Sequence, residues 1–129
     1  MKLSEIKGER VFDVIADIIE PIAVIAENPT ARDFFEKKRP PEGMSAREFV
    51  MQRVKKTLPV LLKENKHELL AIFAAINGES TEDYAKHFDL LTMMRDCTDL
   101  LTDDAFLSLF ISAQNEKSFG SAQENTGAH

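Results

Sequence analysis

The sequence lacks the residues and motifs from which the common kinds of active site are built. It has a single cysteine, so no disulfide can form within the chain, and this is typical of a reducing compartment. It contains no glycine-rich phosphate loop and no Cys-x-x-Cys pair. His67-Glu68 begins a zinc-protease motif, but Ala71 stands where the second histidine is required. We therefore expect no enzymatic activity, no metal site and no cofactor.

Long hydrophobic runs and an excess of positive charge are also missing. The longest apolar run has eight residues, Leu69 to Ile76, whereas a membrane-spanning helix needs roughly 20. Residues 1–10 lack the apolar core of a signal peptide. The net charge of −6 argues against general binding to nucleic acid. We expect a protein that neither enters a membrane nor generally binds nucleic acid.

The apolar run predicts an all-α fold with one helix, about residues 67–77, at its centre. A helix that is apolar on all sides cannot face water, and Asn77-Gly78 is a typical helix end. The rest of residues 1–114 shows helical periodicity, so we expect one compact bundle of about five to six helices. Residues 115–129 are polar and lose this period, which predicts a flexible tail.

Residues typical of helix ends divide the rest of the bundle into separate helices. Helices are expected over residues 9–26, 30–38, 45–64, 81–101 and from about residue 103 to 114. Pro21 and Pro59 are expected to kink or break the first and third of these. Asn28, Ser45, Ser80 and Thr102 are predicted N-caps, and the 81–101 helix carries Cys97 on its apolar face as a buried thiol.

Charge is divided unevenly along the chain. Residues 1–31 have three basic and six acidic residues, residues 32–66 have ten and five, and residues 67–129 have three and eleven. The segments therefore carry −3, +5 and −8. The basic segment either lies against the acidic ones within one molecule or joins two copies into a homo-oligomer. The candidate electrostatic interface comprises Arg53, Lys55, Lys56 and Lys63 with Asp13, Asp17 and Glu20.

Some apolar residues exceed what one core face accommodates. Phe34 and Phe35 are adjacent, and neighbours on a helix point about 100° apart. One ring is therefore either a partner contact or packed beneath the following loop. Met51 is of the adaptable kind used at binding surfaces, and Leu107 and Ile111 widen the apolar side of the last helix. These five residues are candidate partner-binding residues, with simple core packing as the alternative for each.

Several stretches together resemble one family. MKLSEIKGER at residues 1–10 runs into VFDVIADIIEPI at 11–22, and PEGM at 41–44 precedes the basic helix. LLTDDAF at 100–106 leads to FISAQ at 110–114 and then to GSAQEN at 120–125. This sequence is similar to the small tail assembly chaperones of long-tailed phages and prophages of Gram-positive bacteria. The resemblance covers most of the chain, although the family has no catalytic signature.

The resemblance implies a helper of phage tail morphogenesis that acts in the host cytoplasm and is absent from the mature virion. Such proteins bind the long hydrophobic tape measure protein and keep it soluble until tail tube subunits polymerise around it. Many are all-helical and self-associate, so the tape measure protein, the tail tube protein and a second copy are the expected partners. The alternative is a small phage regulatory protein that contacts nucleic acid or an acidic partner through residues 32–66.

Overall fold

The computed structural model describes the backbone of residues 1–127 and the side chains of residues 1–115. In this part of the chain all regular structure is helical, which confirms the predicted all-α fold. A 3-10 turn, η1 (Leu3–Glu5), precedes the helices α1 (Arg10–Ile25), α2 (Pro29–Phe34), α3 (Ala46–Ile76), α4 (Thr81–His87), α5 (Leu90–Leu101) and α6 (Asp104–Gly127).

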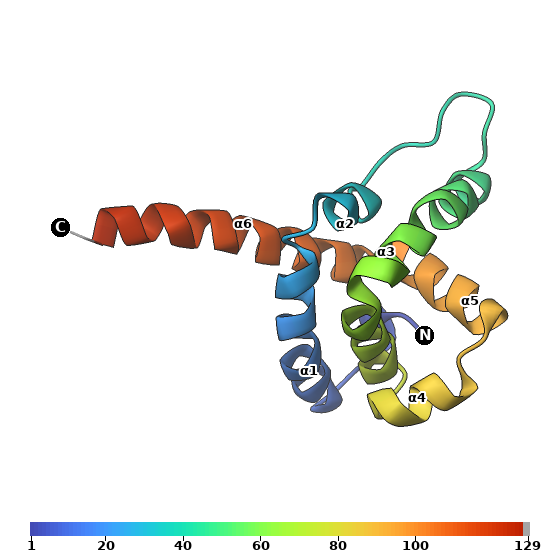
Figure 1. The fold of residues 1–129 in the computed structure, drawn as a ribbon, viewed down its shortest axis with the longest axis horizontal. Coiled ribbons are helices and arrows are strands. Elements are labelled where there is room, and N and C mark those ends of the chain that lie inside the picture. The colour runs from blue at the N-terminus through green and yellow to red at the C-terminus, as the bar shows by residue number, and fades with distance from the viewer. Residues whose placement is uncertain (128–129) are drawn as a thin grey trace.

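The second part of α3 is the centre of the body. The helix packs against α1, α2, α4 and α5, and Figure 1 shows α1, α4 and α5 around its lower half. From Leu69 to Ile76 all side chains are buried except those of Leu70 and Ala71, which are half-buried. The prediction of a central apolar helix is therefore confirmed. The ring of Phe73, in this apolar run, lies beside Tyr84 and Phe88, with ring centroids 6.1 and 6.3 Å away.

A kink at Asn65 separates this central part from the basic first part of α3. Asn65 has non-helical dihedral angles, φ −135° and ψ 37°, and its side chain is buried. Its amide oxygen accepts a hydrogen bond from Asn28 Nδ2 at 2.8 Å, and its Nδ2 donates to Glu68 at 3.2 Å. Asn28 also caps α2 by accepting from the Thr30 amide. The predicted turn at residues 64–66 is thus held by the residue that starts α2.

The two prolines do not divide their helices. α1 continues through Pro21 and α3 through Pro59, and the only non-helical residue within α3 is Asn65. Of the kink or break expected at Pro21, the break is wrong because α1 is continuous, and the split in α3 lies six residues after Pro59. A proline costs one backbone hydrogen bond. Ile18, Ile22 and Leu61, which lie close to the two prolines, are buried, and this packing favours continuous helices.

The C-terminus of α3 is capped by glycine and by an arginine from α1. Gly78 has φ +75°, and the amide of Glu79 donates to the Ala74 carbonyl at 2.9 Å, as in a Schellman motif. Arg10 Nη2 donates to the carbonyls of Ala75 and Ile76 at 3.3 and 3.0 Å. The guanidinium therefore satisfies the Ile76 carbonyl and adds a second donor at the Ala75 carbonyl, which also accepts from the Gly78 amide.

We expect Gly78→Ala to destabilise the protein more than Gly43→Ala. Both glycines have positive φ, which costs a residue with a Cβ about 1–2 kcal/mol. Only at Gly78 does the added Cβ meet another group, Arg10 Nη2 at 2.9 Å, whereas Gly43 has nothing within 4 Å. Urea unfolding of the two variants measures the difference. Equal losses would show that the Arg10 cap contributes little.

The predicted helix 81–101 is two helices. α4 ends at His87, and α5 begins at Leu90 with Asp89 as its N-cap, accepting from the Thr92 amide at 2.8 Å. The apolar period continues across Phe88 and Leu90, which hid this boundary from the sequence. Cys97 is buried as predicted, and burial raises the pKa of its thiol.

A buried polar pair joins α4 to α5. The Tyr84 hydroxyl donates to the carboxylate of Asp96, and both side chains are buried. Burial and this hydrogen bond raise the pKa of Tyr84, so the hydroxyl stays protonated as a donor. Asp96 also accepts from Arg95 Nε at 3.3 Å. The pair ties the two helices together around the split at Asp89.

We expect Tyr84→Phe to cost about 1–3 kcal/mol of unfolding free energy, because it leaves a buried carboxylate short of a partner. Replacing Asp96 with Asn in the same background removes the buried charge and should recover part of this loss. A double-mutant cycle on chemical unfolding curves measures both effects. Additive losses from the two substitutions would contradict the coupling.

The last helix is longer than predicted. Its N-cap is Asp103, which accepts from the Ala105 amide, while the Thr102 hydroxyl donates to the Thr98 carbonyl of α5 instead. α6 continues to Gly127, past the boundary predicted at residue 114, and Figure 1 shows it extending beyond the other helices. Loss of the apolar period does not by itself end a helix.

Candidate protein-interaction surface

Three of the candidate partner-binding residues belong to the core. Phe34, Phe35 and Leu107 are buried. α2 ends at Phe34, and Phe35 has non-helical angles of φ −93° and ψ 4°, so the 100° spacing of a helix does not apply between them. Their rings meet edge to face at 4.9 Å, and Phe35 also contacts Phe106 and Phe110 of α6. The structure therefore places both rings inside, and the interpretation of one of them as an exposed partner contact is wrong.

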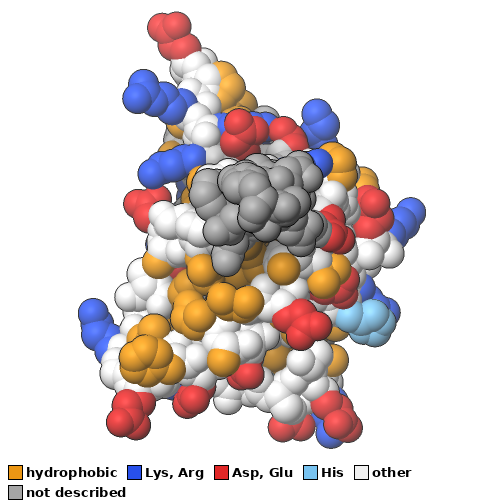
Figure 2. Space-filling model, turned by 90° about the vertical axis from the view of Figure 1, so that its left-hand side faces the viewer, with side chains coloured by type: hydrophobic (Ala, Val, Ile, Leu, Met, Phe, Trp, Pro, Cys, Tyr) orange, Lys and Arg blue, Asp and Glu red, His pale blue; other side chains and the backbone are white. Residues whose placement is uncertain are grey.

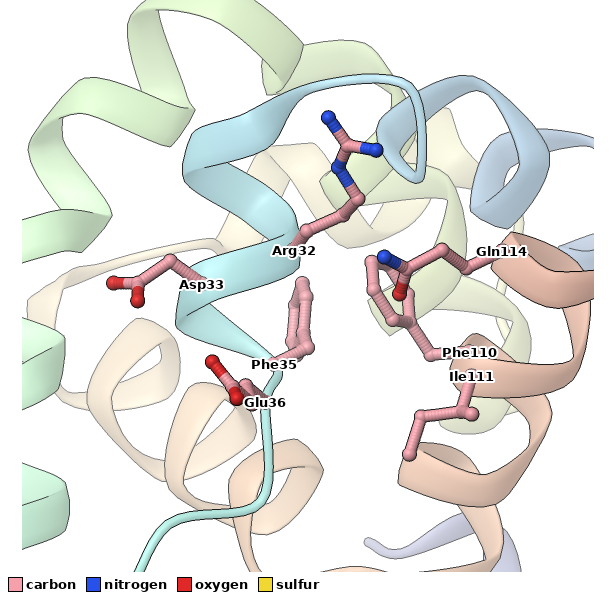
Figure 3. A pocket seen from close by; sticks show the side chains of 7 residues that line it. All are labelled: Arg32, Asp33, Phe35, Glu36, Phe110, Ile111 and Gln114. Carbon is pink, nitrogen blue, oxygen red and sulfur yellow. The ribbon is translucent and has the colours of Figure 1, made fainter. Parts of the chain in front are cut away.

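The other two candidates reach the surface in part. Met51 of α3 is half-buried, and Ile111 of α6 is 39% exposed. Ile111 lies at the side of a hollow of about 370 Å³ between α2 and α6, with Phe35 and Phe110 facing the space between the helices (Figure 3). Arg32, Asp33, Glu36 and Gln114 complete its lining. The lining combines apolar, basic, acidic and amide side chains, so it favours no single class of ligand.

Arg53 has a structural contact that its place in the basic segment did not reveal. Its Nη2 donates to the carbonyls of Asp33, Phe34 and Glu36, at and just beyond the end of α2. Burial lowers the pKa of the guanidinium, while Asp33 and Glu36 act in the opposite direction. Arg53 thus caps α2 and fixes it to α3, so it is engaged within the molecule rather than presented in the predicted electrostatic interface.

The remaining charged candidates face solvent on two different helices. Lys55, Lys56 and Lys63 are exposed on α3, and Asp13, Asp17 and Glu20 are exposed on α1. Within residues 1–115, none of the ion pairs in the structure joins these two sets. The link between the basic segment and the acidic C-terminal third is instead an exposed pair, Lys37 with Asp104 at 3.2 Å.

Sequence reasoning missed an apolar surface on α1. Phe12 is 75% exposed and Ile19 is 50% exposed. Ala16 and Ala23 are exposed at the same spacing, so the four residues form one line along the helix, the α1 apolar stripe. The signal was present in the sequence as a second set of apolar residues at i, i+4, i+7 and i+11.

This stripe lies beside an apolar hollow between α1 and α6. The hollow is about 360 Å³ and is floored by Leu3, Ile6, Val11, Ile15 and Leu109, with Ala105, Ser108 and Ser112 at its rim. Figure 2 shows this side of the molecule, where hydrophobic side chains gather in the middle of the face and acidic side chains lie around its lower part. The stripe and the hollow are therefore neighbouring apolar features on the same side of α1.

Comparison of the chain with protein-family models, with curated protein sequences and with solved structures finds no match in any of the three. In the described part of the chain, no helix is long and apolar enough to cross a membrane. The same residues contain no group of three or more His, Cys, Asp or Glu side chains placed to hold a metal ion.

Proposed function

We propose that the protein is a non-catalytic tail assembly chaperone of a long-tailed phage or prophage, acting in the cytoplasm of its bacterial host. Its client is the hydrophobic tape measure protein, which it keeps soluble until the tail tube protein assembles. The proposal starts from the resemblance of residues 1–22, 41–44 and 100–125 to that family. The observation that carries it is the apolar surface of α1, where Phe12 and Ile19 are left uncovered.

Such a surface suits a client that must be released. A helix can lay its apolar face on a shallow groove of another protein, and side chains at the edges then set specificity. Affinity for a shallow site is limited because each contact buries little area, at about 25 cal/mol per Å² of apolar surface. A chaperone that hands its client to tail tube subunits needs this weak, reversible kind of binding.

Co-purification with the client tests the proposal. The tagged protein is expressed together with the tape measure protein of the same genome, and the affinity eluate is analysed for both chains. We expect the tape measure protein to elute with the tagged protein. A tagged, unrelated helical protein is the control. An eluate that contains no more tape measure protein than the eluate of this control would reject the function.

We also propose that copies of the chain associate through opposite charges. Asp13, Asp17 and Glu20 on one copy and Lys55, Lys56 and Lys63 on another are exposed and unpaired with each other within the molecule. Interactions between exposed charges are largely screened beyond the Debye length, which is about 8 Å at physiological salt and shorter at higher salt. Sedimentation at low and high salt should show association that salt reverses. A monomer at every salt and protein concentration would reject it.

The second candidate function is contact with nucleic acid through residues 32–66. The observation that favours it is the exposure of Lys55, Lys56 and Lys63 along one helix. A mobility shift that weakens steeply with salt and is lost in Lys55→Glu/Lys56→Glu would support this candidate. The absence of any shift at low salt would dismiss it.

A further inference from the structure

The surface of α1 is arranged in three parallel lines of side chains. The α1 apolar stripe, Phe12, Ala16, Ile19 and Ala23, runs along the middle and is exposed. The residues one position earlier are buried or half-buried against the body, and those one position later are exposed: Asp13, Asp17 and Glu20, which form an acidic line, and then Val24. Because each step along a helix turns by about 100°, the acidic line borders the apolar stripe on the side away from the core.

The other border of the stripe is α6. The half-buried Val11 and Ile15 connect the stripe to the hollow between α1 and α6. The rim on α6 is made of small side chains, Ala105, Ser108 and Ser112, which leave room for a helix to approach. The stripe spans twelve residues, from Phe12 to Ala23, so its ends lie about 16 Å apart at a rise of 1.5 Å per residue, or three turns. Its size and shape therefore fit one helix laid along α1.

We propose that this surface binds an amphipathic helix that carries basic residues along one edge. The apolar face of that helix would cover Phe12 and Ile19, and its basic edge would lie against Asp13, Asp17 and Glu20. Arg10, the one basic residue of α1, is occupied with the carbonyls of Ala75 and Ile76 and leaves this line acidic. The inference rests on the proposed function, in which the partner is a helical segment of the client.

A second copy of the chain fits this surface less well. An antiparallel pair of α1 helices, stripe against stripe, would bring two acidic lines together, which is unfavourable. The basic face of α3 has the right charge, but Val60 is the one large apolar side chain exposed there, so it would leave the stripe uncovered. Binding of a basic amphipathic helix would nevertheless compete with charge-driven self-association, because both use Asp13, Asp17 and Glu20.

Two synthetic peptides test the inference. Each has about five helical turns with a leucine and alanine face, and they differ only in having lysine or glutamate along the polar edge. Binding of the labelled peptides to the full chain is measured by fluorescence anisotropy. We expect the lysine peptide to bind at least about tenfold more tightly, a difference of about 1.4 kcal/mol. The proposal would be overturned if neither peptide binds or if both bind equally.

Variants of exposed residues locate the site without risk to the core. Phe12→Ser/Ile19→Ser should weaken the lysine peptide by about tenfold or more, and Asp13→Asn/Asp17→Asn/Glu20→Gln should remove its advantage over the glutamate peptide. Leu90→Ser/Leu91→Ser is the matched control, since these side chains are 68% and 81% exposed at the start of α5. Loss of binding in this control and not in the α1 variants would overturn the assignment. The assignment would also be overturned if the wild-type chain formed a dimer that Phe12→Ser/Ile19→Ser makes monomeric.

Co-purification with the tape measure protein separates this inference from the proposed function. If the wild-type chain does not retain the client, the function fails, and the peptides still decide the chemistry of the surface. If Phe12→Ser/Ile19→Ser retains the client as well as the wild type does, the function stands and the assignment of the α1 surface is wrong.

Discussion

Replacing Phe73 with aspartate is expected to unfold the domain. The ring is buried in the second part of α3 and lies beside Tyr84 and Phe88. The substitution removes this packing and places an unpaired carboxylate in the core, and changes of this kind cost more than about 4 kcal/mol. That loss is a large part of the roughly 5–15 kcal/mol by which a domain is stable. Circular dichroism and urea unfolding measure it.

Phe12→Asp is the matched control for this result, because it makes the same chemical change at a ring that is 75% exposed. It should leave the unfolding transition nearly where it is in the wild type. A folded Phe73→Asp protein with a cooperative transition near that of the wild type would show that the second part of α3 is not the centre of the fold.

Replacing Phe35 with alanine should cost about 3–5 kcal/mol, the range found when a buried phenylalanine is removed. Phe35 joins α2 to α6 through Phe106 and Phe110, at 5.4 and 4.9 Å between ring centroids. The cavity left behind would loosen both helices at once. Ile111→Ala, at the edge of the same aromatic group, should cost much less because its side chain is 39% exposed.

Chemical unfolding of the two variants, together with retention of the client, decides what Phe35 does. A stable Phe35→Ala protein that no longer retains the tape measure protein would restore the reading of this residue as a partner contact. A destabilised protein that retains the client when folded would confirm it as a core residue.

Local signals in the sequence predicted the helices and most of their ends. Asn28, Ser45 and Ser80 cap the helices that follow them, since a cap depends on contacts within four residues. The central helix was predictable because a helix with eight successive apolar residues has no side suited to water. Asp89 was missed although it is a good cap, because the apolar residues on both sides of it continue the period of one helix.

Properties that depend on distant residues were not predictable. Arg53 lies in a basic segment, and nothing near it in sequence shows that it caps α2, 17–20 residues away. The exposure of Phe12 and Ile19 likewise depends on which elements pack beside α1 in the folded protein. Periodicity identifies the faces of a helix, but the neighbouring elements decide which faces are covered.

The solubility of the tape measure protein tests the central claim most directly. The client is expressed alone, with the wild-type chain and with the Leu90→Ser/Leu91→Ser and Phe12→Ser/Ile19→Ser variants, and its soluble fraction is measured after lysis. The proposed function predicts a mostly insoluble client when expressed alone and a mostly soluble one with the wild-type chain; the proposed site predicts rescue by the Leu90/Leu91 variant but not by the Phe12/Ile19 variant. A client that is equally insoluble with and without the wild-type chain would contradict the proposed function.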